Sequence, residues 1–310
     1  DDRPLDIRER RAAFQAESDA ERLAPFRRPL MISDHRPDSG AMLQRIAHER
    51  IESEFARLDR ERPQRPNQAV DRPQHDRQRQ QVWVRINPLN QPMALADLVA
   101  VMPGKPDGIV LPKPLNAHDV QQLDHYLQAL EVREGFALHS TRILPVATEV
   151  AGALFALDSY AGCSPRLAGL TWGAEDLATA IGASTNKKDN GEFDDTFVLA
   201  RSLCLLAAAH AGVQAIDTLN VDFKNTEQLQ RDVQRARRQG FSGKLAIHPD
   251  QVPIINAGFE ATAEELAHAQ RIVDAFAQAG GAGTVQLDGK MVDKPHLTHA
   301  LRMLASRSGL

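Results

Sequence analysis

From residue 82 onward the chain repeats one pattern, in which a short apolar segment is followed by a loop and then by a longer segment with helical spacing. Strands that alternate with helices in this way form a parallel sheet with helices packed outside it. The pattern therefore predicts an α/β fold. Six apolar segments have the length and composition of buried parallel strands, at residues 82–86, 108–112, 142–148, 167–172, 215–221 and 244–248.

Helix signals separate these segments. Asn116 is placed to cap a helix that runs to about Val132, and residues 198–211 are apolar almost throughout. Residues 226–238 are amphipathic and stop before Gly240, while Thr262 and Glu265 form a capping-box pattern ahead of residues 266–277. A closed (β/α)8 TIM barrel needs eight strand–helix units. Two units would have to come from the first 81 residues, where only residues 28–32 resemble a strand.

The first 81 residues differ in composition from the rest of the chain. Arg is abundant there and Lys is absent, since the first lysine is Lys105. Residues 41–58 have the spacing of an amphipathic helix, but residues 62–81 contain almost no apolar side chains and cannot offset their ordering entropy. We therefore predict an atypical, Arg/Gln-rich and partly disordered segment at 1–81, and a barrel domain with a C-terminal helical extension at 82–310. The Arg-rich stretch allows an RNA-binding interpretation, but Asp71 and Asp76 interrupt its positive charge and favour a solvated segment.

Charge and cysteine content restrict the partners and the compartment. The formal net charge of −4 provides no general basic field for nucleic acid or for an acidic membrane. The two cysteines, Cys163 and Cys204, suggest no disulfide framework and fit a reducing compartment. No apolar run approaches the roughly 20 residues of a membrane span. We expect a soluble cytoplasmic protein that binds neither nucleic acid nor membranes.

Polar residues follow the predicted strands at the edge of the sheet where active sites of parallel α/β folds lie. Glu149 and Asp176 come from neighbouring strand ends, so that their carboxylates could converge on one ion. Mg²⁺ commonly takes one or two carboxylates and fills its other positions with water and substrate. The same pattern also fits ordinary acids at strand ends or helix N-termini. The strand-end residues are Arg85, Lys113, Glu149, Glu175, Asp176, Asp222 and His248.

The other strand-end residues have structural interpretations beside functional ones. Glu175 could cap the helix that begins near it, Asp222 could cap a turn, and Lys113 could hold a loop through a salt bridge. His248 fits a hydrogen-bonded structural histidine better than a base. Arg85 is the better functional candidate, because a guanidinium offers a planar fork for a carboxylate or a developing oxyanion.

Several long segments, in order, resemble the citrate lyase β-subunit-like branch of the HpcH/HpaI aldolase family. They are VRIN, ATE, LAGLTWGAEDLATAIGA, ARSLCLLAAAHAGVQAIDT, GFSGKLAIHPDQV and LDGKMVDKPH, and they extend from about Val82 to the end of the chain. The resemblance implies a TIM barrel that uses Mg²⁺, with Mn²⁺ as an alternative, and that assembles as a homo-oligomer, a trimer or a hexamer. It implies a carbon–carbon lyase acting on a small carboxylic acid or CoA thioester, such as malyl-CoA, citramalyl-CoA or a citryl thioester.

The resemblance also assigns residues. Glu149 corresponds to the first metal carboxylate, with a substrate-binding role through the metal, and Asp176 to the second. Arg85 corresponds to the arginine that contacts the substrate carbonyl or carboxylate, and Asp293 to the C-terminal acid that reaches into a neighbouring subunit's site. The common form of the first motif is Ile-Glu-Thr, whereas this chain has Ala-Thr-Glu, so a register with Thr148 at the ligand position is an alternative.

The N-terminal part departs from the family pattern. The segment Arg28-Pro29-Leu30 resembles the first motif of the family only weakly, and the acidic motif of the second strand is absent. The Arg-rich, Lys-free composition suggests the hypothesis that the reading frame of the gene has changed in this region. A search of the other frames of the coding DNA for the missing acidic motif would test it. The departure also supports a second interpretation of function, in which a catalytically impaired barrel serves as a structural or regulatory partner.

Overall fold

The computed structural model describes residues 81–280 and 282–307 of the chain. The strand predicted at residues 28–32 and the helix predicted at residues 41–58 lie outside the described residues. The described part divides into two compact units, one that ends at Ile255 and one that begins at Asn256. Among the described residues, no helix combines the length and the apolar character that a membrane span needs.

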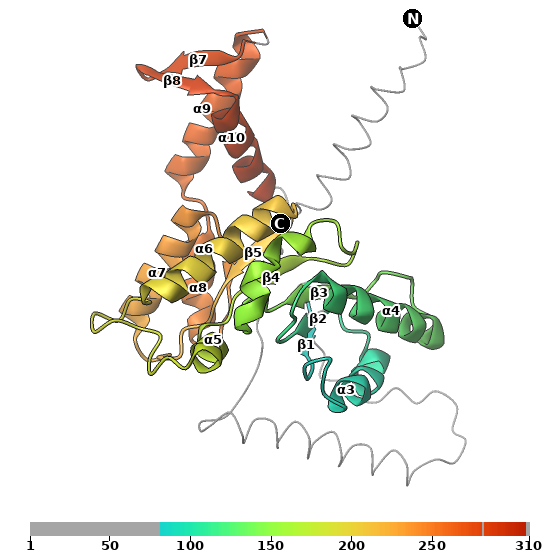
Figure 1. Cartoon of the computed structure of the whole chain (residues 1–310). Helices are drawn as coiled ribbons and strands as arrows, with labels where there is room; N and C mark the ends of the chain where they lie inside the picture. Colours follow the sequence, from blue (N-terminus) through green and yellow to red (C-terminus); the bar gives the residue numbers. More distant parts are fainter. Residues whose placement is uncertain (1–80, 281, 308–310) are drawn as a thin grey trace, which may run out of the picture. The chain divides into compact units, whose positions relative to one another are not determined.

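The first unit contains six strands, and every hydrogen-bonded pair among them is parallel (Figure 1). They form two three-stranded sheets, ordered β1-β2-β3 and β4-β5-β6. The six are β1 (Trp83–Arg85), β2 (Gly108–Leu111), β3 (Arg142–Pro145), β4 (Gly169–Thr171), β5 (Gln214–Asp217) and β6 (Gly243–Lys244).

Parallel bridges join the two sheets between β3 and β4. Ile143 pairs with Leu167, and Val146 pairs with Thr171. The Ala147 N–H donates to the Thr171 carbonyl at 2.7 Å, which continues the ladder past the end of β3. The six strands therefore follow one another in chain order, as the staves of a (β/α)8 barrel do. Within the described residues no strand pairs with the outer edge of β1 or of β6, so these six strands do not close the barrel by themselves.

Helices connect the strands and cover them. The two helices α3 and α4 lie on one side of β1–β3 (Figure 1), and α6 contacts β4 and β5. All four residues of β2 and all four of β5 are buried, as expected for strands with both faces covered. The helices are α3 (Met93–Val101), α4 (Ala117–Glu134), α5 (Ala174–Ile181), α6 (Asp195–His210), α7 (Thr226–Gln239) and α8 (Gln251–Phe259), with short 3-10 turns η1 (Met102–Gly104), η2 (Ala151–Phe155) and η3 (Leu157–Tyr160).

A buried ion-pair network stabilises the amino ends of β3 and β4. Arg166 is fully buried, and its Nε lies 2.5 Å from Asp124 Oδ1 while its Nη2 lies 2.7 Å from Glu131 Oε2. Glu131 also accepts the backbone N–H groups of His139 and Thr141, both at 2.9 Å. Burial alone raises the pKa of Glu131, but the hydrogen bonds from Arg166 and from these amides outweigh it and lower the pKa below its ordinary value.

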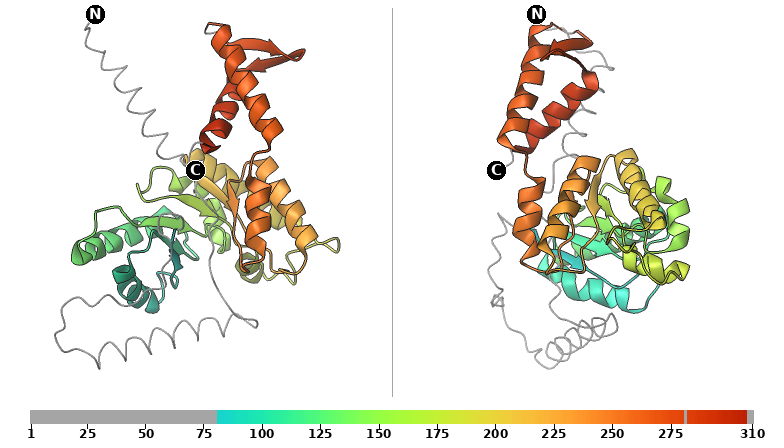
Figure 2. Two further views of the ribbon diagram at one scale, coloured as in Figure 1. Left: turned by 180° about the vertical axis from the view of Figure 1, so that it is seen from behind. Right: turned by 90° about the vertical axis from the view of Figure 1, so that its left-hand side faces the viewer.

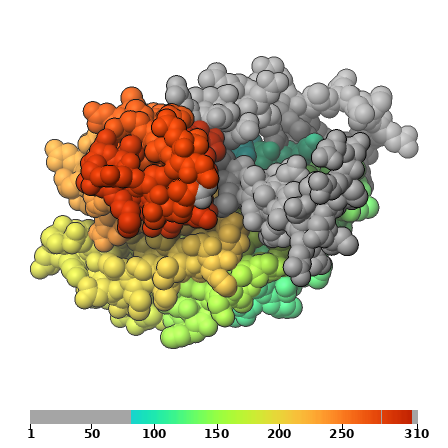
Figure 3. All heavy atoms as spheres, turned by 90° about the horizontal axis from the view of Figure 1, so that it is seen from above, coloured from blue at the N-terminus to red at the C-terminus, as the bar shows by residue number. Residues whose placement is uncertain are grey.

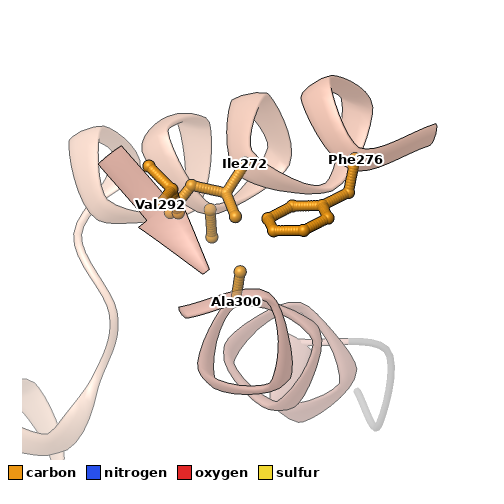
Figure 4. Close-up of a cluster of buried hydrophobic side chains, with 5 residues drawn as sticks. Ile272, Phe276, Val292 and Ala300 are labelled. Carbon is orange, nitrogen blue, oxygen red and sulfur yellow. The ribbon is translucent and has the colours of Figure 1, made fainter. Parts of the chain in front are cut away.

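The second unit is a helical pair joined by a β-hairpin. It contains α9 (Ala263–Gln278), β7 (Thr284–Leu287), β8 (Lys290–Asp293) and α10 (Lys294–Arg307). Helices α9 and α10 lie side by side in both views of Figure 2, and the atoms of the unit pack closely in the space-filling view (Figure 3). Its core consists of Ala269, Ile272, Phe276, Val292 and Ala300, and Figure 4 labels the last four of these.

The helix caps follow the sequence prediction. The Asn116 side chain accepts from the His118 N–H at 2.8 Å and begins α4, and the Thr262–Glu265 capping box begins α9.

The hairpin of the C-terminal extension was not predicted. Its turn, Asp288-Gly289, has positive φ angles of 50° and 78°, as a type I′ turn requires. An Asp-Gly pair is typical of such turns and could have been used to predict the hairpin.

All six strands are shorter than predicted, and the carboxyl ends of β5 and β6 differ most from the prediction. The strand predicted at 215–221 ends at Asp217, and the strand predicted at 244–248 ends at Lys244. The Asn220 side chain accepts the Asp222 N–H at 3.1 Å, which turns the chain away from the sheet after β5. The apolar residues continue past both strand ends because these loops are partly buried. Periodicity alone does not distinguish a buried strand from a partly buried loop.

Candidate metal and substrate site

Glu149 and Asp176 come together at the carboxyl end of the sheet. Glu149 follows β3 and is 6% exposed, and its Oε2 accepts the backbone N–H of Lys113 at 2.7 Å. Asp176 lies in the first turn of α5, directly after β4. The carboxyl groups are close enough for a hydrogen-bonding contact that influences the titration of Glu149. The arrangement predicted from the strand-end positions is therefore present, because adjacent parallel strands end at one edge.

Thr148, the alternative ligand, is engaged in a contact with the backbone. Its side chain is fully buried, and its Oγ1 accepts the Gly173 N–H at 3.1 Å. The hydroxyl thus links the segment after β3 to the segment after β4. Glu149, the next residue, is the side chain that contacts Asp176. The geometry favours the register with Glu149, and not Thr148, at the ligand position.

Gly173 leaves the space that the Glu149 side chain occupies. A Cβ atom at this position would lie 2.6 Å from Glu149 Cγ and 3.3 Å from Glu149 Oε1. The backbone of Gly173 is extended, with φ −121° and ψ 121°, so any residue could adopt its conformation. The glycine is therefore required for close approach of the side chain to the backbone and not for an unusual turn.

The Glu149 carboxyl group is the most perturbed acid of this site. Its pKa is raised to about 7, chiefly by burial and also by the neighbouring Asp176 carboxylate, while the positive charge of Arg85 and the Lys113 amide partly oppose the rise. A carboxyl group with such a pKa lacks sufficient favourable partners for its charge. A cation placed between the two carboxylates would supply them.

Two cations border the carboxylates. Arg85 ends β1 and its side chain is exposed. Lys113 follows β2, and its Nζ lies 3.0 Å from Asp176 Oδ1, with both side chains about 40% exposed. Lys113 has a positive φ of 52°, a left-handed conformation that is unfavourable for a residue with a side chain. The salt bridge that the sequence allowed for Lys113 is present, and its partner is one of the two candidate metal ligands.

The donor set fits a hard divalent cation that retains water and substrate ligands. In the described part of the chain, no group of three or more His, Cys, Asp or Glu side chains could hold a metal unaided. Two carboxylates are what Mg²⁺ uses when substrate oxygens and water complete its octahedron. Glu175 belongs to a different contact, because its Oε1 accepts from the Asn186 side chain at 2.7 Å and ties α5 to the following loop.

The remaining strand-end residues do not join this pair. His248 lies in the loop after β6, where its ring stacks on Phe223 with centroids 4.7 Å apart, in agreement with a structural histidine. Asp222 lies in the loop after β5, and Asp217 is the acid that ends the strand. Asp217 is buried and accepts from Trp172 Nε1 at 2.7 Å and from Arg201 Nε at 2.9 Å. Its bonds are satisfied within the protein, so we regard it as structural.

Asp293 ends β8 in the C-terminal unit. Its carboxylate forms a close contact with the His296 ring, and this hydrogen bond lowers the pKa of Asp293. The predicted role of Asp293 across a subunit boundary stays a prediction.

Known proteins match the chain over most of its length. A family model described as HpcH/HpaI aldolase/citrate lyase matches residues 62–249, and one described as a carbon–carbon bond lyase of the TIM-barrel fold matches residues 192–308. Citrate lyase subunit beta of Haemophilus influenzae is 33% identical over 230 residues, which cover 73% of this chain and 77% of that protein. A (3S)-malyl-CoA thioesterase of Cereibacter sphaeroides is 32% identical over 229 residues, which cover 73% of this chain and 74% of that protein.

A solved structure agrees with these matches. The protein CitE from Mycobacterium tuberculosis, in complex with magnesium, acetoacetate and coenzyme A, superposes with a TM-score of 0.59 at 30% sequence identity. The match covers 73% of this chain and 78% of that one. Together with the chain-order parallel strands, the matches support an α/β, TIM-barrel-like fold.

Proposed function

Because the chain belongs to the HpcH/HpaI aldolase/citrate lyase family, we propose that it is a Mg²⁺-dependent lyase that cleaves or forms a carbon–carbon bond of a hydroxyacyl-CoA ester. The family and the carbon–carbon lyase class, both predicted from the sequence, are confirmed by the matches. The proposal adds the metal and the substrate class, with malyl-CoA, citramalyl-CoA and citryl thioesters as candidates. The observation that carries it is the pair of carboxylates, Glu149 and Asp176, at the carboxyl ends of β3 and β4.

Glu149 and Asp176 would hold the metal in this proposal. Bound Mg²⁺ would supply Lewis-acid stabilisation of negative charge on a carbonyl or carboxylate oxygen of the substrate. The Lys113 amide fixes one Glu149 oxygen through its 2.7 Å hydrogen bond, which leaves the other oxygen to face Asp176. The complex of magnesium, acetoacetate and coenzyme A with the similar protein supports magnesium as the metal.

Arg85 would bind the carbonyl oxygen on which negative charge develops. It ends β1 and is exposed, so its guanidinium is available to an anionic oxygen, and a preorganised cation at that position stabilises enolate-like charge. Asp293 would donate or accept a proton at the acyl carbon, from a neighbouring copy of the chain in a trimer or hexamer. The separation of the C-terminal residues into their own compact unit is compatible with contact to another copy.

Two other outcomes define the alternatives. The similarity to a (3S)-malyl-CoA thioesterase supports hydrolysis of the thioester in place of carbon–carbon cleavage. The second alternative is a catalytically impaired barrel with a structural or regulatory role, for which the unpaired outer edges of β1 and β6 among the described strands are the supporting observation.

The test is product analysis with purified protein, Mg²⁺ and each candidate ester. Lyase activity on these esters releases acetyl-CoA together with an oxo acid, whereas thioesterase activity releases free CoA and a hydroxy acid. We expect Glu149→Ala and Asp176→Ala to lower turnover by at least about 100-fold, because each removes a metal ligand worth several kcal/mol. Asp222→Ala is the matched control, since Asp222 is an exposed acid in the loop after β5 and does not join the pair. Full activity of Glu149→Ala would exclude the proposed site, and Mg²⁺ binding without turnover of any ester would favour the impaired barrel.

A further inference from the structure

Lys113 contacts both candidate metal ligands through different groups. Its backbone N–H donates to Glu149 Oε2 at 2.7 Å, and its Nζ lies 3.0 Å from Asp176 Oδ1. The residue stands between Pro112 and Pro114 and has a positive φ of 52°. A strained conformation of this kind persists only where its surroundings fix it, and such positions concentrate at functional sites. The backbone of Lys113 thus positions the Glu149 carboxylate, while its ammonium group forms an ion pair with the Asp176 carboxylate.

The charges of the site nearly cancel without a metal. Arg85 and Lys113 carry positive charges, and Glu149 and Asp176 can carry two negative charges. A divalent cation added to this set leaves an excess of positive charge that an anionic substrate can neutralise. It also meets the Lys113 ammonium group at Asp176, where both cations use one carboxylate and repel each other.

We propose that Lys113 is an internal counter-cation that competes with the metal for Asp176 and that binds the substrate's carboxylate once the metal has displaced it. The inference rests on the metal site of the proposed function and adds a positioning and substrate-binding residue to it. It follows that the metal alone binds weakly and that the metal and a dianionic oxo acid bind cooperatively. By thermodynamic linkage, each ligand raises the affinity for the other by the same factor.

The exposure of the ion pair limits the size of the effect. Both side chains are about 40% exposed, so solvent and salt screen the interaction. Exposed pairs of this type contribute at most about 1 kcal/mol, which corresponds to a factor of about two to five in metal affinity. The effect should also become smaller as salt is added.

The test is calorimetric titration of Mg²⁺ alone, and of Mg²⁺ with saturating oxaloacetate, into the full chain. Lys113→Met removes the ammonium group and keeps the backbone amide that holds Glu149. We expect it to bind Mg²⁺ alone about two to five times more tightly than the wild type, while the gain in Mg²⁺ affinity caused by oxaloacetate falls. Lys113→Arg keeps the charge and should bind Mg²⁺ as the wild type does.

Lys105→Met is the matched control. Lys105 precedes β2 as Lys113 follows it, has the same φ of 52°, and is exposed at the opposite end of the strand. Circular dichroism of each variant reports whether the fold is retained. Unchanged or weaker Mg²⁺ binding by Lys113→Met, or equal changes in Lys105→Met, would overturn the inference and leave the metal site in place. Absence of Mg²⁺ binding by both the wild type and Lys113→Met would overturn the metal site as well.

Discussion

Replacing Glu149 with Gln should stabilise the metal-free protein at alkaline pH although it removes a proposed metal ligand. The charged carboxylate is unfavourable in its buried position, which is why burial raises its pKa to about 7. The neutral amide of Gln has nearly the same shape, and its oxygen can still accept the Lys113 N–H. The substitution therefore removes the cost of the charge and retains the contact.

The size of this cost follows from proton linkage. The pKa of Glu149 moves from 4.5 to about 7 on folding, and each unit corresponds to about 1.36 kcal/mol. Because the folded-state pKa is raised, the contribution to stability is complete below about pH 4.5, decreases as the pH rises, and is lost once the pH passes about 7. Between pH 5 and pH 8.5, the stability of Glu149→Gln relative to the wild type should rise by about 2 to 3 kcal/mol.

Urea denaturation at a series of pH values measures this difference. The two tryptophans, Trp83 and Trp172, are both buried in the unit that contains Glu149, so their fluorescence reports its unfolding. A chelator should be present throughout, because bound metal would stabilise the charged carboxylate. Addition of excess Mg²⁺ at pH 8.5 should then stabilise the wild type and not Glu149→Gln.

Glu131→Gln is the matched control, because Glu131 is a second buried glutamate with the opposite environment. Arg166 and two backbone amides lower its pKa in spite of burial, so its contribution to stability is full above about pH 4.5 and is lost as the pH falls further. Glu131→Gln should therefore destabilise the protein by roughly 3 kcal/mol at neutral pH and by less in acid. The reasoning fails if the stability curves of Glu149→Gln and of the wild type run parallel from pH 5 to pH 8.5.

Three further substitutions test other parts of the structure. Gly173→Ala places a Cβ against Glu149 and should weaken Mg²⁺ binding about 10- to 100-fold in a calorimetric titration, whereas Gly152→Ala, where nothing lies within 4 Å, should not. Arg166→Met leaves two buried acids unpaired and should lower the free energy of unfolding in urea by about 3–5 kcal/mol. Gly289→Ala, at a φ of 78°, should destabilise the hairpin by about 1–2 kcal/mol, measured as faster amide exchange in β7 and β8.

The order of strands could be predicted from the sequence because each buried strand is a short apolar run bounded by turn or helix signals. The same rule failed at the ends of β5 and β6, where buried loop residues after Asp217 and Lys244 continue the apolar pattern. The hairpin was missed because its two strands are only half-buried, so that Asp288-Gly289 was the stronger signal.

The candidate site could be predicted in part. The strand-end rule located Glu149 and Asp176, because the carboxyl ends of neighbouring parallel strands have to meet. The double contact of Lys113 could not be predicted, since it depends on a left-handed φ and on a hydrogen bond between residues 36 positions apart. The need for Gly173 was likewise invisible, because it arises from the space that a folded side chain requires.

The pKa values of buried acids are shifted in opposite directions at the two ends of the sheet. At the amino ends, Arg166 satisfies Glu131 and Asp124, and the pKa values of both carboxyl groups are lowered although burial opposes this. At the carboxyl ends, Glu149 is as deeply buried but is only partly compensated, and its pKa is raised. The first arrangement stabilises the folded state at neutral pH, while the second reduces its stability until a further positive charge is added. A cation bound by Glu149 and Asp176 would therefore contribute to folding as well as to chemistry, so that the stabilisation of this unit by excess Mg²⁺ should follow the Mg²⁺ affinity of each variant of the site.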